Sequence, residues 1–219
     1  MHYASRMSEP IRFIQCTETA MAHLSHADPT LGRIIAHLGP IQRRGDGDLF
    51  ASVVRHIVGQ QISTAAQTTI WTRMSEALTT IDEESITATS VEELQRFGMT
   101  FRKAGYIHSF ASQVKEGIFD LEAIKEMDDE QAIVALTTIK GIGRWTAEMI
   151  LLFGMGRGDI VSFGDLAIIR GMKTLYGLDE VDRERFDSLR SRYSPYGTAA
   201  SLYLWAVSKM EMSQLSALL

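Results

Sequence analysis

Two short stretches of this chain combine residue types that could do chemistry. Residues 140–143 read Lys-Gly-Ile-Gly and form a glycine turn between two apolar segments. Glycine permits a sharp reversal, and the free N–H groups at the start of the helix that follows could bind a phosphate. Asp165 is a lone carboxylate further along the chain, in Phe-Gly-Asp-Leu. It could stabilise a developing positive charge or orient a water molecule.

Each stretch also has a simpler interpretation. Most Gly-x-Gly turns only connect two helices, and aspartate is a preferred N-cap residue whose side chain accepts from the first backbone N–H groups of a helix. Taken alone, residues 140–143 and Asp165 therefore leave the structural and the chemical roles open, and both roles could coexist.

The composition bounds the class of protein. The chain has 219 residues, 45% of them hydrophobic and 22% charged, as in ordinary globular proteins. No apolar run approaches the roughly 18 residues that a membrane helix needs, so we expect no membrane partner. The net charge of −5 argues mildly against nucleic acid, but backbone N–H groups bind phosphate without charged side chains. The lone Cys16 excludes an internal disulfide and an iron–sulfur cluster held by cysteines.

Helical patterns recur along the chain and predict an all-α fold. Apolar residues at three- and four-residue spacing, with aspartates in N-cap positions, indicate several helices separated by glycine-containing turns. The predicted helices span residues 48–58, 102–114, 128–136, 146–153, 182–193 and 197–210. Strongly alternating β-type segments are missing from the sequence. A helical domain without special chemistry would fit this pattern equally well.

The sequence resembles the helix–hairpin–helix DNA glycosylases, in particular the branch for alkylated bases typified by 3-methyladenine DNA glycosylase II. The pattern Leu-x-x-Ile-Lys-Gly-Ile-Gly-Arg-Trp-Thr-Ala over residues 136–147 is the most specific part, and the segments 50–66, 98–107 and 164–167 agree with it. The resemblance implies a compact form without the N-terminal β-rich domain that some relatives carry. Family hairpins usually have proline where Lys140 stands, and a proline usually stands in the aspartate segment where Gly164 follows Phe163 directly.

The resemblance also implies roles for individual residues. Asp165 would be the catalytic carboxylate. Gln61, with Gln60 and Ile62 beside it, would fill the gap left in the DNA by the flipped-out base; the alternative is an ordinary loop glutamine. Trp145 and Trp205 would line a base pocket, since aromatic faces attract the positive charge of an alkylated purine; the alternative for each is core packing.

The hairpin would hold the DNA backbone. Phosphate contacts would come from the amides of Gly141 and Gly143, with Lys140 and Arg144 either as charged helpers or as solvated surface charges. The resemblance further implies a monovalent cation, sodium or potassium, on three main-chain carbonyls. Those carbonyls would belong to Thr137, Ile139 and Ile142. We expect no required cofactor, and His37, His56 and His108 are interpreted as ordinary helix residues because the histidines lack metal-ligand spacing.

The residue at position 145 bears on the reaction type. In relatives that also cut the DNA backbone, this position holds a lysine that forms a Schiff base, and a Trp indole nitrogen is not nucleophilic. The resemblance therefore implies a monofunctional glycosylase without lyase activity that removes purines such as 3-methyladenine and 7-methylguanine. The alternatives are a glycosylase for other damaged bases and a non-catalytic DNA-binding protein that retains the hairpin.

The expected architecture has two helical subdomains. Residues 45–155 would form a helical barrel with the hairpin, and residues 1–44 would join residues 156–219 in the other subdomain, with Asp165 in a cleft between them. We expect a monomer that binds double-stranded DNA with a damaged base. It would act in the cytoplasm, at the nucleoid, of a prokaryote or in the nucleus of a eukaryote.

Overall fold

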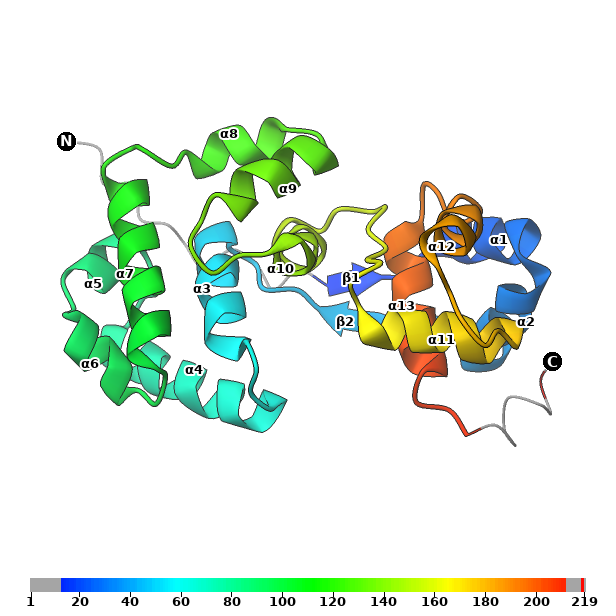
Figure 1. The fold of residues 1–219 in the computed structure, drawn as a ribbon, viewed down its shortest axis with the longest axis horizontal. Helices are drawn as coiled ribbons and strands as arrows, with labels where there is room; N and C mark the ends of the chain where they lie inside the picture. Colours follow the sequence, from blue (N-terminus) through cyan, green and yellow to red (C-terminus); the bar gives the residue numbers. More distant parts are fainter. Residues whose placement is uncertain (1–12, 212–217, 219) are drawn as a thin grey trace. The chain divides into compact units, whose positions relative to one another are not determined.

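The structure, a computed structural model, describes residues 13–211 and residue 218. The rest of the predicted terminal subdomain, residues 1–12, 212–217 and 219, lies outside the described residues. The described chain is mostly helical, as the hydrophobic spacing predicts, and divides into two compact units (Figure 1). One comprises residues 46–155, and the other comprises residues 13–45 and 156 onwards. Among the described residues, no helix is long and apolar enough to cross a lipid bilayer.

The first unit is built around one apolar helix, α3 (Leu49–Gly59), in which Val53, Val54, Ile57 and Val58 are fully buried. Helix α3 packs against α4, α7, α10 and the π-helix η1 (Figure 1). The other elements of the unit are α4 (Thr64–Leu78), α5 (Glu83–Thr87), α6 (Val91–Arg96), α7 (Phe101–Lys115), α8 (Leu121–Glu126), α9 (Asp129–Thr137), α10 (Arg144–Ile150) and η1 (Leu151–Met155).

The N-caps in this unit follow the predicted pattern. Asp48 begins α3 by accepting a hydrogen bond from the N–H of Ala51 at 2.8 Å, and Asp128 begins α9 by accepting one from Gln131 at 2.8 Å. Such a cap satisfies a backbone donor that the helix itself leaves without a partner.

One predicted α-helix ends differently. The segment predicted as a single helix over residues 146–153 is α-helical only to Ile150 and continues as the π-helix η1. At Gly154 in η1 a Cβ atom would lie 2.6 Å from Oγ of Ser52 on α3, so the Ser52 side chain packs directly against the backbone of η1. Apolar spacing does not distinguish the wider π turn from an α turn, which is why the sequence missed it.

A partly buried polar cluster lies beside this contact. Ser52 Oγ donates to Asp46 at 2.7 Å, and His56 Nδ1 lies 2.9 Å from the Ser52 carbonyl and 3.6 Å from Asp46 Oδ2. Burial lowers the pKa of His56, and the Asp46 carboxylate opposes that shift only partly. His56 is therefore part of a polar cluster with Ser52 and Asp46, which its sequence context does not indicate.

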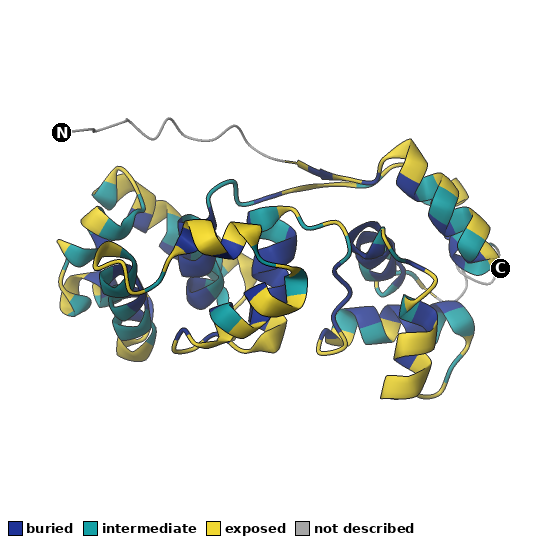
Figure 2. Cartoon of the chain, turned by 90° about the horizontal axis from the view of Figure 1, so that it is seen from above, coloured by how far each residue is buried: buried dark blue, intermediate teal, exposed yellow. Residues whose placement is uncertain are grey.

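The second unit also surrounds one apolar helix, α13 (Gly197–Val207), which is buried from Gly197 to Leu204. Helix α13 packs against α1, α2 and α11. The other elements are β1 (Phe13–Gln15), α1 (Glu18–Ala27), α2 (Pro29–Leu38), β2 (Gln42–Arg44), α11 (Leu166–Tyr176) and α12 (Arg183–Arg190). Figure 2 shows the buried residues on the inner sides of the helices within each unit.

The short antiparallel pair of β1 with β2 was not predicted. Its register pairs Phe13 with Arg44 and Gln15 with Gln42. Three residues per strand are too few to show an alternating pattern, so the sequence carries no signal for it. Its presence does not change the all-α class, because the two strands form the only sheet among the described residues.

A buried carboxylate ties the helices of the second unit together. Asp28, 1% exposed, caps α2 by accepting from the N–H of Leu31 at 3.0 Å. Its other oxygen accepts from the Tyr176 hydroxyl at 2.9 Å and from Arg192 at 3.3 Å. Burial, reinforced by Tyr193 and Asp28, raises the pKa of Tyr176. These bonds hold the end of α11 against the start of α2, and so help to orient the helix that begins at Asp165.

Candidate active site

The hairpin lies between α9 and α10. The N–H of Ile142 donates to the carbonyl of Ile139 at 3.0 Å and closes the turn. Gly141 sits inside it with φ +91°, a conformation that residues with a side chain rarely adopt. Gly143, the exposed N-cap residue of α10, has no side chain with which to occupy the first N–H groups of that helix. The turn therefore offers backbone donors at a helix start, where an anion is favoured.

The two charged residues at the hairpin differ in their surroundings. Lys140 is exposed. The Arg144 guanidinium donates to both oxygens of Glu130, at 2.8 and 2.7 Å, and to Glu148 at 3.1 Å. The Glu130 hydrogen bond, with the neighbouring carboxylate charges, raises the pKa of Arg144 further above its high ordinary value. A phosphate at Arg144 would compete with Glu130, which weakens the case for Arg144 as a helper.

The three carbonyls of the predicted cation site lie at the end of α9 and in the turn that follows. Thr137 is the last residue of α9, where helical carbonyls lack an intrahelical partner, and Ile139 already accepts from the N–H of Ile142. A carbonyl has a second lone pair, so the donor set fits a sodium or potassium ion. Among the described residues, no group of His, Cys, Asp or Glu could hold a metal ion instead.

The loop after α3 carries the predicted gap-filling residue. Gln61 is exposed and has φ 56°, one of two described non-glycine residues at positive φ. The neighbouring Gln60 side chain donates from Nε2 to the carbonyl of Gly141 at 2.7 Å. The structure thus brings the loop of Gln61 and the hairpin together within the first unit.

The two tryptophans of the predicted pocket belong to different units. Trp145 is in the first turn of α10 and 42% exposed, which is unlike a core side chain. Trp205 is near the end of α13 and half-buried.

Asp165 is the N-cap residue of α11 and only 8% exposed. Its Oδ1 accepts hydrogen bonds from the N–H groups of Ala167 at 2.9 Å and Ile168 at 3.0 Å. The capping role is therefore real. A carboxylate oxygen can accept more than one hydrogen bond, so capping does not by itself exclude a chemical role. Phe163, two residues before it, is 38% exposed, and Leu166, directly after it, is 79% exposed.

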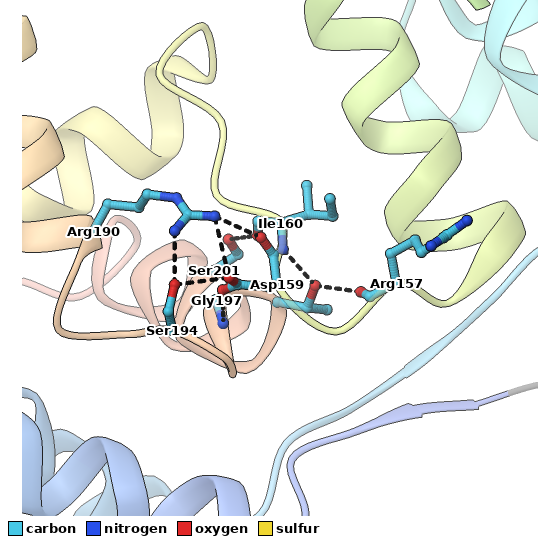
Figure 3. A network of polar contacts seen from close by, with 8 residues as sticks. Arg157, Asp159, Ile160, Arg190, Ser194, Gly197 and Ser201 are labelled. Carbon is cyan, nitrogen blue, oxygen red and sulfur yellow. Dashed lines mark hydrogen bonds and ion pairs between the residues drawn. The ribbon is translucent and has the colours of Figure 1, made fainter. Parts of the chain in front are cut away.

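The segment that leads to Asp165 is bound to the start of α13 by a polar network (Figure 3). Asp159 accepts from the N–H of Gly197 at 3.0 Å, from Ser194 Oγ at 2.7 Å and from Arg190 at 3.3 Å. Ser201 Oγ donates to the carbonyl of Ile160 at 2.7 Å. Asp159 therefore caps α13 from outside that helix, a role that sequence spacing alone could not reveal.

Helices α11 and α13 are also in close backbone contact. A Cβ atom on Gly171 would lie 2.9 Å from the carbonyl carbon of Leu204 and closer still to its oxygen. Only glycine allows this approach. The helix that starts at Asp165 and the helix that carries Trp205 are thereby locked together within the second unit.

Several known proteins are similar to this chain in sequence and in fold. Residues 54–194 match the family model of the HhH-GPD superfamily base excision DNA repair proteins. The chain is 29% identical over 199 residues to a DNA-3-methyladenine glycosylase 1 of Schizosaccharomyces pombe, covering 87% of each protein. A crystal structure of a DNA-3-methyladenine glycosidase from Bacillus halodurans matches 94% of this chain and 100% of its own, with a TM-score of 0.82 and 30% identity.

A second solved structure includes DNA. It is a 3-methyladenine DNA glycosylase of Schizosaccharomyces pombe in complex with abasic DNA, and it matches 89% of this chain and 98% of its own with a TM-score of 0.75 and 28% identity. The chain is a helical protein with a glycine hairpin that begins one helix and a buried carboxylate that begins another. The chain belongs to the HhH-GPD superfamily of base excision DNA repair proteins.

Proposed function

We propose that this protein is a monofunctional DNA glycosylase that removes alkylated purines of the 3-methyladenine and 7-methylguanine type and leaves an abasic site. The state of Asp165 carries the proposal. Asp128 and Asp182 cap their helices from exposed positions, whereas Asp165 is nearly buried. Burying a carboxylate is costly, so its position sets Asp165 apart from these two caps and supports a role beyond capping. The names of the relatives support the substrate class.

The DNA would be held and opened by the first unit. Backbone amides at Gly141 and Gly143 would bind phosphate, and exposed Lys140 would add a positive charge. Since a base inside the stack is out of reach, it must be flipped out at a cost of a few kcal/mol, and Gln61 would fill the gap. The complex of a relative with abasic DNA supports a DNA partner.

Asp165 would act on the bond between sugar and base. An alkylated purine carries a positive charge in DNA and leaves as a neutral base when the electron pair of the C1′–N bond moves onto it. Water then bonds to C1′ and releases one proton, so the products are free base and an abasic sugar. The Asp165 carboxylate would stabilise the positive charge that develops on the sugar and would orient the water. Trp145 and Trp205 would provide aromatic faces for the cationic base.

The absence of lyase activity follows from position 145. Covalent cleavage of the backbone needs an amine that forms a Schiff base with the sugar. An indole nitrogen cannot do this, because its lone pair belongs to the aromatic ring, and Lys140 precedes the turn instead of following it. Two structures of an 8-oxoguanine glycosylase/lyase from Clostridium acetobutylicum are 19% and 18% identical to this chain and show a common fold only.

We further propose that the protein works as a monomer on double-stranded DNA, in the nucleoid or the nucleus, without a required cofactor. The carbonyls of Thr137, Ile139 and Ile142 would hold a sodium or potassium ion, which would place positive charge near a bound phosphate.

The test compares base release by the wild type, Asp165→Asn and Asp182→Asn on methylated duplex DNA. Asparagine caps helices as well as aspartate does, so both variants should fold. Asp182, which caps α12 by accepting from the N–H of Arg185 at 2.8 Å, is the matched control. We expect free 3-methyladenine and alkali-labile abasic sites from the wild type and Asp182→Asn only, and no strand breaks before alkali treatment.

Each other outcome has a distinct meaning. Release by Asp165→Asn at the wild-type rate would remove Asp165 from the mechanism. Strand breaks without alkali, or trapping of the protein on DNA by borohydride, would contradict the monofunctional assignment. DNA binding by the wild type without any base release would favour the non-catalytic alternative or another lesion.

A further inference from the structure

Helix α7 carries a lysine whose contacts concern the loop of Gln61. The ammonium of Lys103 donates to the carbonyl of Val58 at 2.8 Å and to the carbonyl of Gln60 at 2.6 Å. Both carbonyls lie at the C-terminal end of α3, where a helix leaves acceptors without intrahelical partners and where positive charge is favourable. The Lys103 side chain therefore holds the backbone directly before Gln61.

The same face of α7 supports the hairpin. Tyr106 is three residues after Lys103 and so lies on the same side of the helix. A Cβ atom on Gly141 would lie 2.5 Å from Tyr106 Cδ2, so the ring packs directly against the turn. The Gln60 side chain then closes the arrangement through its 2.7 Å hydrogen bond to the carbonyl of Gly141.

The conformation of Gln61 explains why such support is needed. At φ 56° a residue with a side chain is in a sparsely populated region, and such a residue persists only where its surroundings hold it. Gln61 is itself exposed. Its restraint comes from Gln60 directly before it, whose carbonyl is bound by Lys103 and whose side chain is bound to Gly141.

We propose that Lys103 is a positioning residue that fixes the loop carrying Gln61 relative to the hairpin, so that filling the gap in the DNA and holding its backbone are performed by one rigid element. This inference rests on the proposed function, because Gln61 must enter the gap for its position to matter. Gln60 acts with Lys103, since it links the same loop directly to Gly141.

The test measures how well the protein distinguishes a duplex with an abasic-site analogue, tetrahydrofuran, from the same duplex without it. Lys103→Met keeps the length of the side chain and removes the donors. A hydrogen bond to a charged group contributes enough that its loss should lower affinity for the analogue duplex about tenfold. Affinity for the intact duplex, where no gap exists to be filled, should stay within about twofold of wild type. Lys103→Arg, which keeps the charge and the donors, should retain most of the discrimination.

Lys125→Met is the matched control. Lys125 is on α8 in an exposed pair with Glu122, at 2.8 Å, and its substitution should leave both affinities unchanged. Gln60→Ala provides a second route should Lys103→Met fail to fold, because it removes a side-chain bond at the surface. It should lower discrimination in the same direction. The double variant should lose less than the sum of the two single losses, because both residues hold one loop.

The outcomes separate this inference from the proposed function. If Lys103→Met or Gln60→Ala distinguishes the two duplexes as well as the wild type does, the positioning role is refuted. The proposed function is untouched by this result, provided that the wild type releases methylpurine. An equal loss of affinity for both duplexes would also refute the positioning role, because it would mean a general loss of DNA binding. Failure of Lys103→Arg to retain discrimination while melting at the wild-type temperature would contradict the role of the ammonium contacts. A wild type that releases no base would refute the proposed function instead.

Discussion

Replacing Gly171 by alanine should destabilise the protein, because the added methyl group has nowhere to go. It would overlap the backbone of Leu204 on α13, at 2.9 Å from the carbonyl carbon and nearer to the oxygen. A backbone cannot rotate away as a side chain can, so the cost should fall at the upper end of the range for overpacking, about 3 kcal/mol. The higher helix propensity of alanine offsets about 1 kcal/mol. The net loss is about 2 kcal/mol, or roughly 6 °C in melting temperature for a chain of this size.

Gly105→Ala is the matched control for this prediction. Gly105 is also inside a helix, α7, but a Cβ atom there would meet nothing within 4 Å. Only the propensity gain applies, so this variant should be more stable by about 0.5–1 kcal/mol. Urea unfolding of both variants and the wild type measures the difference. Equal changes in the two variants, or a Gly171→Ala protein as stable as the wild type, would refute the claim that α11 and α13 meet backbone to backbone.

Three further predictions concern other contacts. Because burial lowers the pKa of His56 in the folded state, the unfolded chain binds more protons than the folded one as pH falls below about 6.5, so stability should fall from pH 7 to pH 5. His56→Gln should weaken this pH dependence of the unfolding free energy in urea titrations, and an unchanged pH dependence would contradict the prediction. Asp159→Ala should cost about 2 kcal/mol of unfolding free energy, since three donors lose their acceptor; a loss within the error of a urea titration would show that the network is dispensable. Glu130→Gln should free Arg144 for phosphate and raise the salt slope of DNA binding by about one; an unchanged slope would mean that Arg144 does not face the DNA.

The helices and their starts could be predicted because their causes are local. Three- and four-residue apolar spacing marks α3 and α7, and aspartate N-caps mark the starts of α3 and α9. The all-α class and the superfamily follow from patterns of this kind together with the hairpin segment. These features depend on residues close together in the sequence, so a single sequence contains them.

The remaining features depend on contacts between distant residues. Lys103 reaches Val58 and Gln60, more than forty positions earlier, and Asp159 reaches Gly197. Nothing near Lys103 in the sequence indicates which carbonyls it will meet, although it lies in a segment that resembles the family. The capping role of Asp165 is local and could be anticipated, whereas its burial could not, because burial is set by elements elsewhere in the chain. The catalytic, pocket and DNA-contact roles stay predictions, and the proposed experiments test the catalytic and DNA-contact roles.

The order in which the two units occur along the chain has a consequence for synthesis on the ribosome. The described residues of the first unit, 46–155, form one continuous segment, so this segment can fold as soon as it emerges. Helices α1 and α2, which pack against each other, emerge before it, yet the other partners of α2, helices α11 and α13, are made only afterwards. At typical rates of translation the delay is on the order of 10 s. During that time α2, whose residues Leu31, Ile34 and Ile35 are buried in the finished protein, has only α1 to pack against. A chain that stops after residue 155 would therefore leave α1 and α2 with each other but without α11 and α13.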